Sequence, residues 1–152
     1  LSEQPWMNCH FDFERRNLMV DSNHEIAVID FQDLCIGPVG IDLAGIIVDH
    51  YISYSDELIN DALKHYIKSS QLDVSVKDVF EWLRWGGIQR NMRILGTLSN
   101  LYIQDNRTFR LKDLPGILEN LITLIPNDEF MSLKEYLSSA VMPKLHQELK
   151  AL

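Results

Sequence analysis

Three side chains near the start of the chain have the types and spacing of a site that transfers phosphoryl groups. Four residues separate Asp12 from Asn17, and Asp30 follows an apolar segment further along. A carboxylate can accept the proton of a hydroxyl as that hydroxyl attacks. Carboxylate and amide oxygens suit Mg2+, which neutralises the charge of nucleotide phosphates. The pattern predicts Asp12 as the catalytic base and Asn17 with Asp30 as ligands of Mg2+ and ATP.

Two short strands are expected to position these groups. Leu18–Val20 and Ile26–Ile29 are apolar and partly β-branched, and the segment between them is polar. This pattern predicts a β-hairpin, with Asn17 directly before its first strand and Asp30 directly after its second. Loops anchored by strands often carry catalytic groups. As an alternative, Asp12 and Asn17 are only turn formers beside a strand.

Beyond the hairpin the apolar residues recur at helical spacing. A first helix is expected to start at Asp42, and a second follows Ser55 as its N-cap. Their predicted buried stripes are Leu43, Ile46, Ile47 and Tyr51 in the first, and Leu58, Ala62, Leu63, Tyr66 and Ile67 in the second.

Three further helix starts are predicted. A capping box at Ser75–Asp78 opens the longest helix, roughly Val76 to Tyr102, and Asp113-Leu114-Pro115 begins the next. A second box at Ser132–Glu135 is expected to open a final helix to about Leu149. The pair Gly86-Gly87 inside the longest helix indicates either a close backbone approach or a break into two helices. The predicted fold class is α+β, mainly α-helical, with a small hairpin region and about four to six helices.

Composition limits the classes of function. A chain of 152 residues with 46% hydrophobic residues fits one domain, 1–152. Its net charge of −8 argues against a nucleic-acid partner, and it has no long apolar run and no signal peptide. We therefore expect a cytoplasmic protein with no membrane partner. Cys9 and Cys35 are expected to be buried, reduced thiols rather than a disulfide or a zinc site.

Three segments resemble the C-terminal lobe of the aminoglycoside phosphotransferase and choline kinase-like superfamily, which has the protein-kinase fold. They are His10–Val20, Val28–Ala44 and Trp85–Leu98. The first two contain H-F-D-x-x-x-x-N and D-F-Q, which resemble the kinase patterns H-R-D-x-x-x-x-N and D-F-G. Within the superfamily, D-F-Q-D and the Gln89-Arg90 helix resemble bacterial anomeric kinases of N-acetylmuramate and N-acetylglucosamine.

The resemblance implies an ATP- and Mg2+-dependent kinase with an alcohol acceptor, here the anomeric hydroxyl of an amino sugar in cell-wall recycling. It implies Asp42 as a brace for the catalytic loop, although Asp42 as a helix N-cap stays open. His10 is expected to support the loop by hydrogen bonds. Asp33 is a candidate for contact with the metals or the substrate. Arg90 is a candidate for the substrate cleft, with a solvated helix face as its alternative.

Two residues depart from the superfamily pattern. Phe11 stands where Gly or Arg is common, and Glu14 stands where His is frequent. Glu14 adds negative charge beside the proposed base. Either change is expected to alter substrate choice or activity. Trp82 and Trp85 are expected in the core, with a sugar-stacking platform as the alternative.

The chain lacks an initiator Met, a G-x-G-x-x-G loop and a V-A-I-K-like stretch. We therefore expect the N-terminal nucleotide-clamping lobe to be absent, and this fragment to be inactive alone. The alternatives are an aminoglycoside or choline-like kinase, whose cationic substrates would suit the acidic charge, and a non-catalytic kinase-like binding module. Self-association of the truncated lobe through exposed apolar surface is a further expectation.

Overall fold

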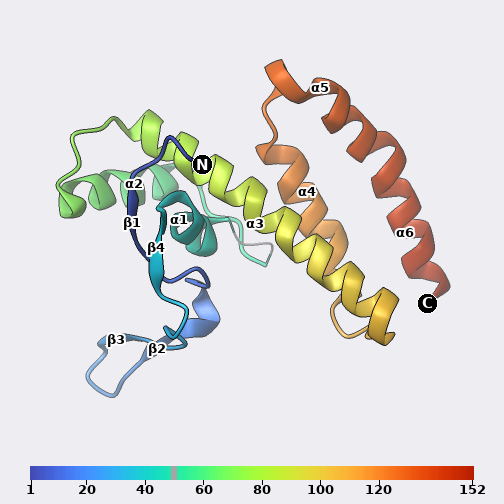
Figure 1. The fold of residues 1–152 in the computed structure, drawn as a ribbon, viewed down its shortest axis with the longest axis horizontal. Helices are drawn as coiled ribbons and strands as arrows, with labels where there is room; N and C mark the ends of the chain where they lie inside the picture. Colours follow the sequence, from blue (N-terminus) through green and yellow to red (C-terminus); the bar gives the residue numbers. More distant parts are fainter. Residues whose placement is uncertain (49–50) are drawn as a thin grey trace. The chain divides into compact units, whose positions relative to one another are not determined.

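The computed structural model describes residues 1–48 and 51–152. It is mainly α-helical, with two small antiparallel sheets (Figure 1), which confirms the expected fold class. The chain divides into two compact units, Leu1–Gly87 and Ile88–Leu152. Among the described residues, none of the helices has the length and apolar character needed to cross a bilayer.

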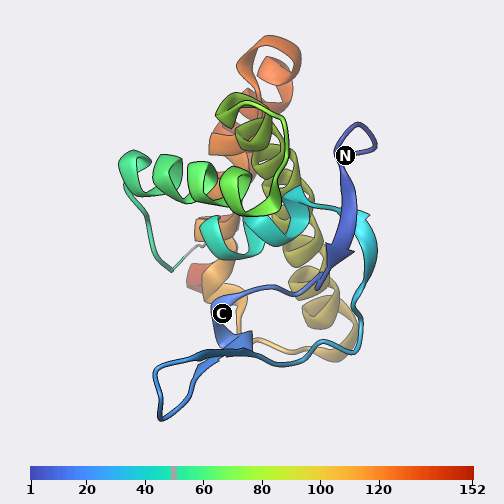
Figure 2. The same cartoon turned by 90° about the vertical axis from the view of Figure 1, so that its left-hand side faces the viewer.

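The strands all lie in the first unit. Strand β2, Leu18–Val20, pairs antiparallel with β3, Ile26–Val28, so the predicted hairpin is confirmed. A second pair was not predicted: β1, Trp6–Cys9, lies antiparallel to β4, Cys35–Pro38. Gly and Pro in β4 are poor strand formers, which hid the strand in the sequence. In both views the hairpin extends away from helix α2, Asp56–Ser70 (Figures 1 and 2).

Helix α1, Gly40–Ile47, begins two residues before the predicted start. Asp42 therefore lies in its first turn rather than at its N-cap, which is Val39. The predicted extension of this helix to Tyr51 crosses residues 49–50, which lie outside the described residues. Tyr51 itself is exposed and is not helical.

Helix α2 starts as predicted, since the Ser55 side chain accepts the N–H of Leu58. The prediction of its buried residues is partly wrong, because Leu58 and Ala62 are exposed and Ile59 packs against the core instead. Ala44, Leu63, Val79 and Leu83 form the core of this unit. The core thus joins α1, α2 and the start of helix α3, Val76–Asp105.

The predicted capping box at the start of α3 is confirmed, because Ser75 and Asp78 exchange hydrogen bonds. The helix is continuous through Gly86-Gly87, so of the two alternatives predicted for this pair the break into two helices is wrong. The other alternative, a close backbone approach, is confirmed. A Cβ at Gly86 would lie 1.9 Å from the carbonyl oxygen of Gly40, and one at Gly40 would lie 2.0 Å from that of Trp82. Two glycines thus let α1 and α3 touch backbone to backbone.

The second unit contains the end of α3 and three further α-helices. Helix α4, Leu114–Leu124, starts with Pro115 in its first turn, as predicted. Helix α5, Asn127–Tyr136, continues through a π-helical segment, Leu137–Val141, into α6, Met142–Ala151. The core contains Leu98, Leu111, Leu114 and Ile117, with Leu145 and Leu149 of α6 packed against it.

The predicted helix start at Ser132 is wrong, because Ser132 lies inside α5. The helix begins at Asn127, directly after Pro126, with Asp128 and Glu129 in its first turn. Acidic residues favour a helix N-terminus, and this earlier signal is the one the chain uses. The backbone does leave helical geometry nearby, at Phe130, where φ is −127° and ψ is 27°.

Candidate active site

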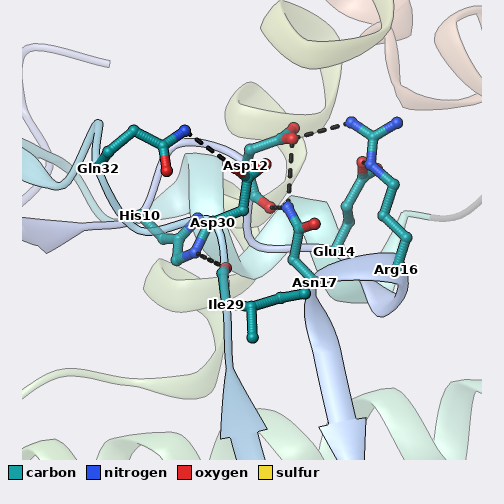
Figure 3. Close-up of polar contacts among 8 residues, drawn as sticks. All are labelled: His10, Asp12, Glu14, Arg16, Asn17, Ile29, Asp30 and Gln32. Atoms are coloured by element: carbon teal, nitrogen blue, oxygen red, sulfur yellow. Dashed lines mark hydrogen bonds and ion pairs between the residues drawn. The ribbon is translucent and has the colours of Figure 1, made fainter.

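Asp12 and Asn17 are joined by direct hydrogen bonds (Figure 3). Asn17 is buried at the end of a 3-10 turn, Arg15–Asn17, which leads into β2. Its Nδ2 donates to the carbonyl oxygen of Asp12 at 2.8 Å and to Asp12 Oδ2 at 3.3 Å. Because Nδ2 faces Asp12, the amide oxygen of Asn17 is the end left to bind a cation.

Asp30 lies on the same side of the hairpin as Asp12 and Asn17 (Figure 3). The N–H of Ile29 donates to the carbonyl oxygen of Asn17 at 3.0 Å, which extends the β2–β3 ladder to the residue before Asp30. Asp30 then adopts a left-handed conformation, with φ of 64°. Its Oδ1 accepts Gln32 Nε2 at 2.9 Å, and the side chain is exposed. The predicted hairpin therefore places Asp30 one residue beyond the backbone partner of Asn17, whose side chain contacts Asp12.

Asp42 holds the backbone that precedes Asp12. Its Oδ2 accepts the N–H of His10 at 2.6 Å, and its Oδ1 accepts the N–H of Phe11 at 2.9 Å. The N-cap of α1 is Val39, and Asp42 lies in the first turn of the helix. The alternative role of Asp42 as the N-cap is therefore wrong. Phe11 has a positive φ of 64°, a strained conformation for this residue type, which the two hydrogen bonds help to hold.

His10 ties the same segment to the end of β3. Its ring is buried, and Nε2 lies 2.9 Å from the carbonyl oxygen of Ile29 (Figure 3). Since a carbonyl oxygen only accepts, Nε2 carries the proton. His10 and Asp42 are thus placed where the expected loop support requires them.

The two residues that depart from the superfamily pattern, Glu14 and Phe11, both make defined contacts. Arg16 pairs with Glu14 through Nε and with Asp12 Oδ2 at 2.8 Å, so the added negative charge of Glu14 faces a guanidinium (Figure 3). The Phe11 ring lies over Gly37 of β4, where a Cβ would come within 2.4 Å of the ring. A side chain at position 37 would therefore displace Phe11.

The candidate substrate residues lie in different units. Asp33 is exposed in the turn after Asp30, in the first unit. Arg90 lies on α3 in the second unit and is only 7% exposed, which contradicts the solvated-face alternative. Trp82 is half-buried and packs against the core of the first unit, in agreement with the core prediction.

One structural residue near the site was missed. Gln4 is buried; its Oε1 accepts the N–H of Gly40 at 3.0 Å, and its Nε2 donates to the carbonyl oxygen of Trp82 at 3.2 Å. The side chain joins the start of α1 to α3. A lone Gln before a strand carries no sequence signal of such a role.

Burial raises the pKa values of two side chains in the first unit, Cys9 and Tyr66. The pKa of the Cys9 thiol rises to about 11, chiefly through burial and then through the nearby negative charge of Asp42. Burial also raises the pKa of Tyr66 above its usual value. Cys9 and Cys35 are both free thiols, as predicted, but Cys35 is exposed rather than buried.

The donor set fits Mg2+ better than zinc. In the part of the chain that the structure describes, no group of three or more His, Cys, Asp or Glu could hold a metal. Mg2+ is commonly held by one or two protein oxygens, with water and substrate phosphates completing its shell. The Asn17 amide and the Asp30 carboxylate are a set of this kind.

A hairpin with an Asp and an Asn before its first strand and an Asp after its second is typical of kinase-like phosphotransferases. Residues 1–84 match the family model described as the phosphotransferase enzyme family. The chain therefore belongs to the phosphotransferase enzyme family.

Curated relatives match a larger part of the chain. The N-acetylmuramate/N-acetylglucosamine kinase of Neisseria meningitidis serogroup B is 30% identical over 80% of this chain and 37% of its own length. The kinase of the same name from Pseudomonas aeruginosa is 30% identical over 90% of this chain and 42% of its own. The one from Pseudomonas putida is 29% identical over 74% and 34%. The chain thus spans less than half the length of these relatives.

Proposed function

We propose that the protein is an ATP-dependent phosphotransferase that acts on the anomeric hydroxyl of an amino sugar such as N-acetylmuramate or N-acetylglucosamine. The observation that carries the proposal is the hydrogen bonding of Asn17, whose side chain donates to Asp12 and whose backbone carbonyl accepts from Ile29, the residue before Asp30 (Figure 3). The names of the relatives support the choice of acceptor.

The proposed roles follow from the contacts. Asp12 accepts the proton of the acceptor hydroxyl, while Asn17 holds the Asp12 carboxylate in place through Nδ2. The Asn17 amide oxygen and Asp30 hold Mg2+, which neutralises phosphate charge when bound. His10 and Asp42 position the loop, and Asp33 of the first unit is proposed to contact the substrate.

We further propose that residues 1–152 supply the catalytic and substrate-binding lobe, and that the nucleotide clamp lies outside them. Phosphoryl transfer depends on holding both the nucleotide and the acceptor in position. On this proposal the 152-residue chain alone turns over little or no ATP. Turnover near the rate of a longer polypeptide containing these residues would contradict it.

The acceptor is tested by assaying that longer polypeptide against amino sugars and against aminoglycosides and choline. We expect ATP-dependent transfer to the sugars. Transfer only to the amines would favour the second candidate, which the net charge of −8 supports.

The roles are tested by substitution in the same polypeptide. Asp12→Asn is expected to lower kcat by about 10² to 10⁴, the usual contribution of a general base. Asp30→Ala should weaken Mg2+–nucleotide binding in a titration, because it removes a metal ligand. Asp61→Asn, an exposed change on α2, is the matched control. Unchanged transfer and nucleotide binding in both site variants would contradict these roles, and no transfer by the unsubstituted polypeptide to any of these acceptors would indicate a non-catalytic binding module.

A further inference from the structure

The two cysteines of the chain lie directly opposite each other on neighbouring strands. Strands β1 and β4 are side by side (Figures 1 and 2), and their antiparallel register pairs Cys9 with Cys35. Directly opposite residues of an antiparallel pair have Cα atoms about 4.5 to 5.5 Å apart, with both side chains on the same face of the sheet. Disulfide-bonded cysteines have Cα atoms about 4.4 to 6.8 Å apart. The register therefore holds these two residues at a separation that a disulfide can span.

The side chains of the two cysteines are also close to each other. Both are free thiols, Cys9 buried and Cys35 exposed. The Sγ of Cys9 donates to the carbonyl oxygen of Gly37 at 3.3 Å, so this thiol already contacts β4. Burial raises the pKa of Cys9 most, followed by the charge of Asp42, and a negative charge on Cys35 raises it further. The Cys9 thiol is thus near enough to Cys35 to respond to its charge.

We propose that Cys9 and Cys35 form a reversible redox site, at which a low-molecular-weight disulfide such as glutathione disulfide converts the two thiols into a disulfide between β1 and β4. The exposed Cys35 reacts first: its thiolate attacks one sulfur of the oxidant, forms a mixed disulfide and releases one small thiol. Cys9 then loses its proton, and its sulfur attacks the Sγ of Cys35 and releases the second small thiol. Two protein thiols and one small disulfide become one protein disulfide and two small thiols.

The disulfide would close a loop that contains the whole candidate active site. Asp12, Asn17 and Asp30 all lie between the two cysteines in the sequence. A cross-link at the two ends of this segment restricts the unfolded chain, so oxidation should stabilise the fold around the site. Because Cys35 is exposed, a small thiol can reach the bridge and reduce it again. The redox site does not depend on the proposed function, since the register pairs the cysteines whatever reaction the loop performs.

Mass spectrometry of the 152-residue chain after treatment with excess glutathione disulfide tests the bond itself. The chain should lose the mass of two hydrogen atoms and regain it with dithiothreitol. Residues 1–14 and 17–63 contain no Lys or Arg, so trypsin separates the two cysteines at Arg15 and Arg16. The unreduced digest should therefore contain these two peptides joined by a disulfide. A chain that keeps glutathione on Cys35, or a dimer joined through Cys35, would overturn the proposal.

A second measurement tests whether the fold favours this disulfide. At equilibrium with glutathione, the ratio of the Cys9–Cys35 disulfide to the mixed disulfide on Cys35 should be at least about tenfold higher in the folded chain than in urea, because the register holds the two residues together. The urea midpoint of the oxidised chain should exceed that of the reduced chain. Cys35→Ser, an exposed change, is the matched control and should show no shift with the oxidant. Equal ratios in the folded chain and in urea, or an equal shift in Cys35→Ser, would overturn the proposal.

Discussion

The carboxylate of Asp42 accepts the backbone N–H of His10 at 2.6 Å, although the two residues are 32 positions apart. Its second oxygen takes the N–H of Phe11. A carboxylate that accepts two backbone donors forms stronger hydrogen bonds than a neutral acceptor would. Through this contact, the position of α1 fixes where the chain turns toward Asp12. The start of α1 is fixed in turn by Gln4 and by the close approach of Gly40 to α3.

Asp42→Asn is expected to lower the free energy of unfolding of the chain by about 2 kcal/mol. The amide keeps one acceptor oxygen but turns an NH2 group toward the second backbone donor. Asp73→Asn, an exposed change, should have little effect and serves as the control. Urea unfolding measures both variants. Equal stabilities would show that the two backbone hydrogen bonds contribute nothing.

Replacing each of two glycines in α3 by alanine should change the stability of the chain in opposite directions. Gly86→Ala would put a Cβ 1.9 Å from the carbonyl oxygen of Gly40, so α1 and α3 must move apart, at a cost of at least about 2 kcal/mol. Gly96 has nothing within 4 Å of its Cβ position, and Gly96→Ala should stabilise the helix by about 1 kcal/mol. Thermal unfolding gives both values, and a Gly86→Ala chain as stable as the wild type would contradict the close approach.

The difference between local signals and contacts of distant segments explains what could be predicted from the sequence. Signals that act over three or four residues were reliable: the Ser55 N-cap, the Ser75–Asp78 box and the β2–β3 hairpin all formed where expected. Two contacts between distant segments were not predicted. The β1–β4 pair and the role of Gln4 depend on residues that meet only after folding.

The candidate site was predictable because it is built on a local element. Asn17 and Asp30 border one hairpin, so correct prediction of the hairpin brought them together without knowledge of the wider fold. Two local signals competed near Ser132, and the earlier one, after Pro126, started the helix. The exposure of Leu58 and Ala62 follows from which elements pack on α2, and helical periodicity alone cannot decide this.

The two side chains that contact the Asp12 carboxylate should differ in their effect on stability. Arg16→Gln removes ion pairs to Asp12 and Glu14, but the Arg16 side chain is 62% exposed. Exposed ion pairs contribute about 1 kcal/mol or less, so this change should be small. Asn17→Ala removes a buried side chain that donates to Asp12, at a cost of about 2 kcal/mol. Urea unfolding measures the free energy of unfolding of both variants. A larger loss of stability for Arg16→Gln than for Asn17→Ala would contradict this ranking.

The β2–β3 hairpin is the surface on which we expect self-association. Its apolar side chains are largely exposed: Met19, Val20, Ile26, Val28, Ile29 and Phe31. A two-stranded sheet also leaves unpaired backbone groups at its edges. Sedimentation should show a mass that rises with concentration, and Ile26→Lys should reduce this rise. Leu58→Lys, an exposed apolar residue on α2, is the control. A monomer at all concentrations would exclude self-association.

The two cysteines should differ in reactivity at neutral pH. Cys35 is exposed, whereas Cys9 is 1% exposed and its Sγ donates to the carbonyl oxygen of Gly37. The thiolate is the reactive form, and burial raises the pKa of Cys9 from 9.0 to about 11. A maleimide should therefore label one thiol in the folded chain and two in urea, with Cys35→Ser removing the fast reaction.

The raised pKa of Cys9 also predicts a loss of stability at alkaline pH. Between pH 9.0 and about 11 the unfolded chain releases this proton while the folded chain keeps it. The unfolded state then binds fewer protons, so the stability that is fully present below pH 9.0 falls as the pH rises through this window. Cys9→Ala should unfold with a shallower pH dependence there, because its unfolded state has no thiol at that position to ionise. Urea midpoints measured across the window test this, with Cys35→Ala as the matched control. Parallel curves for wild type and Cys9→Ala would show that the Cys9 thiol ionises as readily in the folded chain as in the unfolded one.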